Sequence, residues 1–201
     1  TYKIIPMVTE AIAPTYTAIP NEVLIGQAGR QPGQTGNLAV AGDIVTDLYY
    51  QQNDLIKVAM GNSVADTGNV KNYSLVNDIA LGIEAVVARG LTSKCDFFHK
   101  GKVNVLKLAG AVGAAVSSTA TTVFTSYVPN GNSSPLTLTP FPLYTTRVLF
   151  SDLTFKCNSK QIPISNFELV LTNNLQVDGY SSKRTSGGAE VQQIMEPIRN
   201  G

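Results

Sequence analysis

The two cysteines and the single histidine are the side chains of this sequence best suited to bind a soft metal ion or to act as a nucleophile. Because successive side chains of a strand alternate between its faces, Cys95 and His99 are expected on one face, with Cys157 able to reach them in space. A zinc site usually has four ligands, at least three of them from protein, and a nucleophilic cysteine needs a positioned base. Three scattered residues provide neither pattern, so the sequence predicts a small buried thiol beside a partly exposed imidazole.

Glycine-rich and acidic segments give no better site for catalysis. Residues 26–36 hold four glycines, but the segment lacks the Gly-Lys-Ser/Thr ending of a phosphate-binding loop and no long helix follows it. The carboxylates of Asp43, Asp47, Glu84 and Glu168 fall on different predicted strands, so no pair can be assigned acid and base roles. The sequence therefore predicts a protein that is not an enzyme and that binds neither a cofactor nor a metal.

The composition is that of a protein with a core but with few surface charges. Apolar residues make up 43% of the 201 residues, which is ordinary globular usage. Charged residues make up only 14%, well below the roughly 25% of an average soluble domain. Such a surface is expected where neighbouring molecules cover it, and a neutral secreted β-protein is the alternative. The length fits a single domain over residues 1–201.

Charge and cysteine usage narrow the range of partners. Lys and Arg total 15 while Asp and Glu total 14, and the densest basic pair is Lys183-Arg184. Tight nucleic-acid binding needs clustered cations and is not expected, whereas loose enclosure of DNA is compatible with this balance. Two well-separated cysteines fit folding in a reducing cytoplasm. No apolar run reaches the roughly 18–20 residues of a membrane span, so no membrane partner is expected.

A single short helix is predicted directly after residue 53. Asn53 is a suitable N-cap, Asp54 is favourable in the first turn, and Gly61 is placed to end the helix. The helix has only about two turns, and isolated helices need roughly 12–15 residues to persist. It is therefore expected to pack on a sheet.

Most of the remaining chain alternates between apolar and polar residues, as strands do. Lys100-Gly101 is expected to form a tight hairpin turn between two of these strands. Many short strands, one short flanking α-helix and long loops predict a mainly β fold, an antiparallel β-sandwich or barrel-like domain. The predicted strands cover residues 22–25, 37–50, 83–88, 95–99, 102–109, 111–124, 146–150 and 167–171.

Two long loops, residues 26–36 and 125–143, are the candidates for contacts between subunits. The second carries four prolines, and loops longer than roughly 12–15 residues are usually functional or disordered. An ordinary solvent-exposed loop is the alternative at both places. The residues proposed for contacts between subunits or rings are Gly29, Arg30, Gln31, Pro32, Asn130, Gly131, Asn132, Pro135 and Phe141.

The strand edges are a second route to association between copies. An edge strand exposes unpaired N–H and C=O groups, and monomeric proteins usually protect it with Lys, Pro or a bulge. Residues 111–124 are small and poor in charge, so they offer little such protection. Pairing between unlike edges of identical copies closes into a ring, which is the assembly expected here.

Several segments follow one another in a recognisable order between residues 40 and 175. They are residues 42–48 with 54–61, residues 83–90, residues 97–108 and residues 164–175. The most telling parts are an aromatic residue followed after two residues by Gly and then by Val-Asn, and a strand that ends in Asn-Asn-Leu. This order of segments resembles that of the tail tube proteins of long-tailed bacteriophages.

The resemblance implies a β-sandwich that forms hexameric rings, which stack into the hollow tail tube through which DNA is ejected into the host. The implied partners are the protein itself, the tape measure, terminator and distal tail proteins, and phage DNA held transiently without sequence-specific binding. The implied location is the virion, after assembly in the bacterial host cytoplasm. Such proteins usually continue with further strand sequence beyond residues 192–201, so the chain is expected to lack some C-terminal residues.

Two other classes remain open at this point. Another tail protein, a head-tail joining or terminator protein, or a secretion-system tube subunit would share the fold and would differ in whether it forms long polymers or single rings. A carbohydrate-binding β-sandwich belongs to a different class. The chain has no tryptophan to stack on sugars and its eight tyrosines are scattered, which counts against that class.

Overall fold

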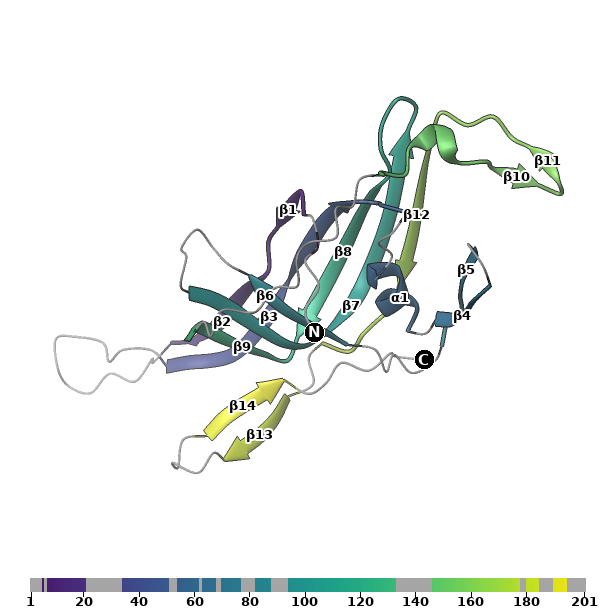
Figure 1. Ribbon diagram of the computed structural model, residues 1–201. Helices are drawn as coiled ribbons and strands as arrows, with labels where there is room; N and C mark the ends of the chain where they lie inside the picture. Colours follow the sequence, from purple (N-terminus) through teal and green to yellow (C-terminus); the bar gives the residue numbers. More distant parts are fainter. Residues whose placement is uncertain are drawn as a thin grey trace, which may run out of the picture.

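The computed structural model describes residues 5, 7–20, 34–50, 54–61, 63–67, 70–76, 82–87, 94–132, 146–177, 180–184 and 190–194. The strands within these ranges pair antiparallel throughout, and one α-helix, α1 (Asp54–Met60), flanks them (Figure 1). The predicted mainly β, sandwich-like fold is confirmed. The strands are β1 (Thr9–Glu10), β2 (Ala13–Ile19), β3 (Gln34–Asp47), β4 (Ser63–Thr67), β5 (Val70–Tyr73), β6 (Ile83–Val87), β7 (Lys94–Ala111), β8 (Ser117–Phe124), β9 (Ser126–Asn132), β10 (Lys156–Cys157), β11 (Lys160–Gln161), β12 (Asn166–Thr172), β13 (Tyr180–Arg184) and β14 (Glu190–Ile194).

The largest sheet runs in the order β1-β3-β8-β7-β12, with β2 also paired to β3. The long strands β3 and β7 hold it together, since β3 pairs with three strands and β7 with β8 and β12. Three small hairpins, β4–β5, β10–β11 and β13–β14, lie outside this sheet. The strand predicted over residues 37–50 is thus confirmed as far as Asp47, and it begins earlier, at Gln34.

Strand β7 corrects the predicted hairpin turn at Lys100-Gly101, because it continues through both residues. Lys100 has φ +49, and its N–H donates to the Glu84 carboxylate at 3.0 Å. At Gly101 a Cβ would overlap the ring of Phe124, so the absent side chain makes room for a core aromatic. The positive φ therefore bends one strand instead of joining two.

The bend gives β7 two sets of partners. Its first half pairs with β6 and β9, and its second half pairs with β8 and β12. The two layers that result enclose a core in which Val40, Phe98, Val103, Ala120 and Phe124 are fully buried. Burial of these apolar side chains is the main force that stabilises the fold.

Helix α1 packs against β7 as expected for so short a helix. Leu55 and Ala59, four residues apart on one face, are its buried residues and belong to the core. Gly61 has φ +85 and its N–H donates to the carbonyls of Lys57 and Val58, which confirms the predicted stop. The predicted N-cap, Asn53, lies outside the described residues.

Two predicted strands are shorter than expected. The strand predicted over residues 111–124 begins only at Ser117, because residues 112–114 form a turn in which Gly113 has φ +81. The strand predicted over residues 146–150 is reduced to isolated bridges and a 3-10 helix, Phe150–Asp152. The backbone of Val148 bonds to Leu48 on one side and to Val116 on the other, so no continuous ladder forms.

The predicted long loops are also corrected where they can be followed. Residues 126–132 form β9, which pairs with the first half of β7, and residues 34–36 belong to β3. Pro129 is tolerated because β9 is an edge strand. The pairing of β9 with β7 is also irregular between Cys95 and Phe97, where the register shifts. Residues 26–33 and 133–145 lie outside the described residues, as does the strand predicted over residues 22–25.

Candidate assembly surfaces

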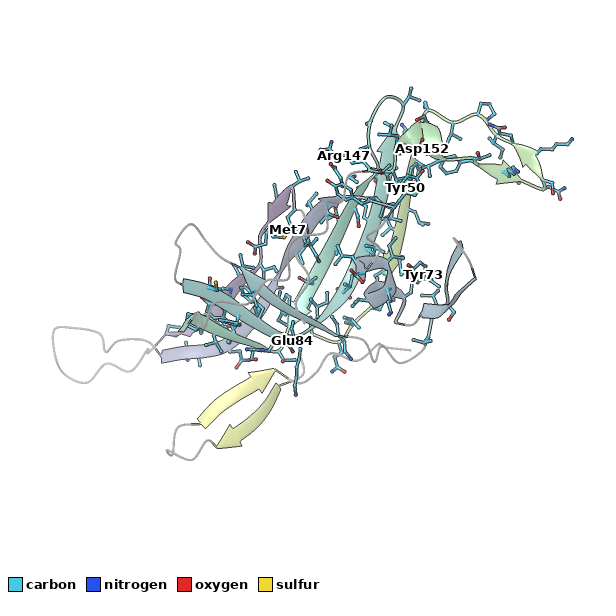
Figure 2. The ribbon with its side chains drawn as sticks, viewed as in Figure 1. Met7, Tyr50, Tyr73, Glu84, Arg147 and Asp152 are labelled. Carbon is cyan, nitrogen blue, oxygen red and sulfur yellow. The ribbon has the colours of Figure 1, made fainter. Side chains whose placement is uncertain are left out.

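The cysteines and the histidine do not form one site. Cys95 is half-buried and Cys157 is exposed, and both thiols are free, whereas a buried thiol was predicted. Glu84, which contacts His99, lies far from the β10–β11 hairpin that carries Cys157 (Figure 2). Within the described ranges no three His, Cys, Asp or Glu side chains are grouped as metal ligands.

His99 has a structural partner in the adjacent strand β6. Its Nδ1 lies 2.6 Å from Oε2 of Glu84, while Oε1 of the same carboxylate accepts the N–H of Lys100. The His99 carbonyl accepts both the N–H and the hydroxyl of Thr125. These contacts connect β6 and the residue before β9 to the bend in β7.

One face of the large sheet, opposite the core and α1, carries mostly hydroxyls and small side chains. Strand register places Val45, Thr119, Lys107 and Val170 in one row across four strands. Adjacent rows are Asp43, Thr121, Val105 and Thr172, and Asp47, Ser117, Ala109 and Glu168. All of these residues are half-buried or exposed. We call this surface the open face.

The charged groups of the open face are largely compensated. Lys107 Nζ lies 2.6 Å from Glu168 Oε2, and Arg147 Nε lies 3.2 Å from Asp47 Oδ2. The Thr121 hydroxyl donates to Asp43 Oδ1 at 2.6 Å. The face therefore presents paired charges and hydroxyl groups to solvent, without a cluster of cations that would hold phosphate.

The two edges of the large sheet expose apolar side chains. On the β1–β2 edge, Val8 is 62% exposed and Tyr16 is 54% exposed, with Met7 and Ile19 similarly open. On the opposite edge, Leu169 of β12 is 60% exposed and Val170 is 49% exposed. Among the described strands none pairs with the outer side of β12. Unprotected apolar edges of this kind favour pairing with another chain.

The sequence-predicted contact residues fall elsewhere. Asn130, Gly131 and Asn132 end β9, where Gly131 pairs with Cys95 and Asn132 with Lys94. Gly29, Arg30, Gln31, Pro32, Pro135 and Phe141 lie outside the described residues.

Sequence reasoning singled out residues 111–124 as the exposed edge, but most of that segment is the central strand β8. The true edge, β12, carried a signal that was available in the sequence. Phe167, Leu169 and Leu171 occupy one face of that strand, but Val170 adds an apolar side chain on the other. Val170 stands between the polar Glu168 and Thr172 of that face, so it is an exposed apolar side chain of the kind expected where a neighbouring chain approaches.

These features define a β-sandwich protein with a broad polar sheet face and two sheet edges that expose apolar side chains. A family model described as phage tail tube protein matches residues 9–195, nearly the whole chain. The chain belongs to the phage tail tube protein family. Comparison with curated protein sequences gives no match. None of the described helices has the length and apolar character needed to cross a membrane.

Proposed function

We propose that copies of this chain assemble into hexameric rings that stack as the hollow tube of a phage tail and conduct DNA when it is ejected. The observation that carries the proposal is the pair of unlike, apolar edges on one sheet, together with the family to which the chain belongs. The ring size of six comes from the resemblance to tail tube proteins. No catalytic step is part of this function.

Edge pairing explains how a ring closes. The outer side of β12 offers backbone N–H and C=O groups to the β1–β2 edge of the next copy, so main-chain hydrogen bonds continue the sheet from subunit to subunit. Leu169 and Tyr16 lose water when these edges meet. Because the two edges differ, the contact is heterologous, and a fixed rotation per subunit gives a closed ring.

The open face is proposed to line the channel. In a ring built by edge pairing, the sheets join into one continuous wall, and one face of that wall points inward. Helix α1 and the second layer cover the other face, so they lie outside. Hydroxyl groups and compensated charges allow DNA to slide along this face. Tight binding of phosphates would require clustered Lys and Arg.

The remaining partners follow from this role. The tube meets tape measure, terminator and distal tail proteins within the virion, after assembly in the host cytoplasm. The segments around Gly29–Pro32, Pro135 and Phe141 remain proposals for contacts between stacked rings. Their deletion is expected to leave single rings in place of tubes.

Electron microscopy of the purified protein at rising concentration tests the proposal. Wild-type protein is expected to form stacked rings or hollow tubes, and Leu169→Lys is expected to abolish them by placing a charge on the β12 edge. Leu75→Lys is the matched control, since Leu75 is 56% exposed and lies outside both edges. Single closed rings would indicate a joining or terminator protein, and a monomer at all concentrations would refute self-assembly.

A further inference from the structure

A projecting hairpin, residues 153–165, extends from the end of the large sheet on the side away from β1 (Figure 1). We call it the arm. Its strands β10 and β11 are joined by Asn158 and Ser159, whose φ values of +50 and +66 form the two-residue turn that favours a hairpin. Residues 156–163 are all exposed.

The base of the arm is fixed by an aromatic cluster. The ring centroid of Phe155 lies 5.2 Å from that of Phe167 in β12 and 6.3 Å from that of Phe150. Gly110 leaves room for this cluster, because a Cβ there would lie 2.8 Å from the Phe167 ring. The Val112 N–H also donates to the Ser165 carbonyl at 3.0 Å. The arm therefore has a defined direction, past the β12 edge.

Within the chain the arm has little to stabilise its outer half. A two-stranded hairpin is at best marginally stable in water. Ile162 is 42% exposed, and Lys156 and Lys160 make the arm basic, since residues 153–165 contain no acidic side chain. A surface that is both basic and apolar fits a partner that is both acidic and apolar.

The opposite edge of the same molecule has that character. Glu10 of β1, which is half-buried, supplies a carboxylate, and Met7 and Val8 are exposed close to it in the chain. Strand pairing sets Glu10 opposite Ile44, so an acidic group and apolar groups share one short stretch of edge. If β12 pairs with this edge of the next copy, the arm points over it.

We propose that the arm of one copy docks on the β1–β2 edge of the adjacent copy in the same ring, at the β1 end. Lys156 and Lys160 then lie close to Glu10, and Ile162 covers Met7 and Val8. This inference rests on the proposed ring and adds a clamp beside the paired strands. The partner of the arm is therefore a second copy of this chain, and the contact is again heterologous.

Cross-linking through the native Cys157 tests the arrangement. In a Cys95→Ser background, Cys157 is the remaining thiol. Adding Val8→Cys and treating assembled tubes with a short bis-maleimide is expected to give a ladder of covalent oligomers. The control is Val128→Cys in β9, an exposed position at 44% that lies outside both the β1–β2 edge and the β12 edge, and it is expected to give no ladder.

The outcomes distinguish the proposed arm contact from the proposed assembly of the tube. Tubes that form but give no ladder with Val8→Cys, or an equal ladder with Val128→Cys, would overturn the arm contact and leave the proposed function standing. Failure of the Cys95→Ser chain and of the wild type to polymerise would overturn both. A ladder confined to Val8→Cys supports both.

Charge reversal gives an independent readout. Lys160→Glu is expected to raise the protein concentration needed for assembly about tenfold at low salt, and less at high salt, because screening weakens surface charge pairs. Lys57→Glu on α1 is the control and is expected to leave assembly unchanged. Circular dichroism of both variants checks the fold. Equal assembly of Lys160→Glu and the control at low salt would refute the contact.

Discussion

The two edges of the large sheet are built in different ways, although both expose apolar side chains. At the β1–β2 edge the chain crosses directly over Gly42, where a Cβ would overlap the backbone of Ala11 and Ile12. Ile12 is consequently buried in the core at 1% exposure. This edge is held by close backbone packing and carries the carboxylate of Glu10.

The β12 edge is held by one neighbouring strand and by side-chain contacts. Asn173, at 1% exposure, follows β12 and donates from Nδ2 to the carbonyls of Ala59 and Val103, both at 2.8 Å. The aromatic base of the basic arm completes this side. Identical subunits can join head to tail only if their two edges differ and fit each other, and here they differ in charge and in construction.

The largest effect is expected from Gly42→Val. The added side chain has to displace the backbone of Ala11 and Ile12, and overpacking against backbone is expected to cost about 3 kcal/mol of unfolding free energy or more. Urea denaturation measures this cost. Ala41→Val, on the exposed face one residue away, should stay within about 0.5 kcal/mol of wild type. Similar losses in both variants would show that the crossing does not depend on Gly42.

The polar anchor of the other edge is expected to matter somewhat less. Asn173→Ala leaves the buried carbonyls of Ala59 and Val103 without this donor, which is expected to lower the unfolding free energy by about 2 kcal/mol. Thermal and urea denaturation measure the loss. Thr172→Ala, at the exposed neighbouring position, provides the matched control. A loss in the control as large as that in Asn173→Ala would argue against a specific polar anchor.

Removal of the aromatic base should loosen the arm alone. Phe155→Ala is expected to lower global stability by only about 1 kcal/mol, because Phe155 is half-buried. Trypsin cleavage after Lys156 and Lys160 should accelerate severalfold, since local opening governs proteolysis. Ile162→Ala, which keeps all three rings, is the control. Unchanged cleavage would mean that the rings do not fix the arm.

The smallest effect is expected at Tyr50, beside the base of the arm (Figure 2). Desolvation of its hydroxyl raises the pKa of Tyr50, and the hydrogen bond and negative charge of Asp152 raise it further. A raised pKa favours the neutral hydroxyl in the folded state, so the stabilisation is present below about pH 10 and is lost as pH rises through the folded pKa.

Difference absorbance titration of wild type against Tyr50→Phe measures this shift. The Tyr50 midpoint should lie above the ordinary value of about 10, and Asp152→Asn should bring it closer to that value. A midpoint unchanged by Asp152→Asn would show that Asp152 does not raise the pKa of Tyr50.

Much of the secondary structure follows from local sequence. Helix α1 ends at Gly61 because only a residue tolerant of φ +85 fits there, and β12 alternates as strands do. The family resemblance also depended on such local patterns, and the match over residues 9–195 confirms it. Each of these signals lies within one short segment of chain.

The predictions were wrong where residues distant in the sequence determine the local structure. Lys100-Gly101 has the composition of a turn, but Phe124 occupies the space over Gly101 and Glu84 bonds Lys100, so the strand continues. Residues 126–132 contain proline and glycine, yet they pair with β7 because an edge position tolerates both.

The sequence by itself determined the fold class, the helix and its stop, and the family, because periodicity and turn chemistry are local properties. Only the tertiary structure decided which strands became edges. A strand is an edge when no other strand of the chain reaches its open side, and that depends on the bend of β7 and the crossing over Gly42. The edges and the arm, where association is proposed, are therefore properties of the folded chain.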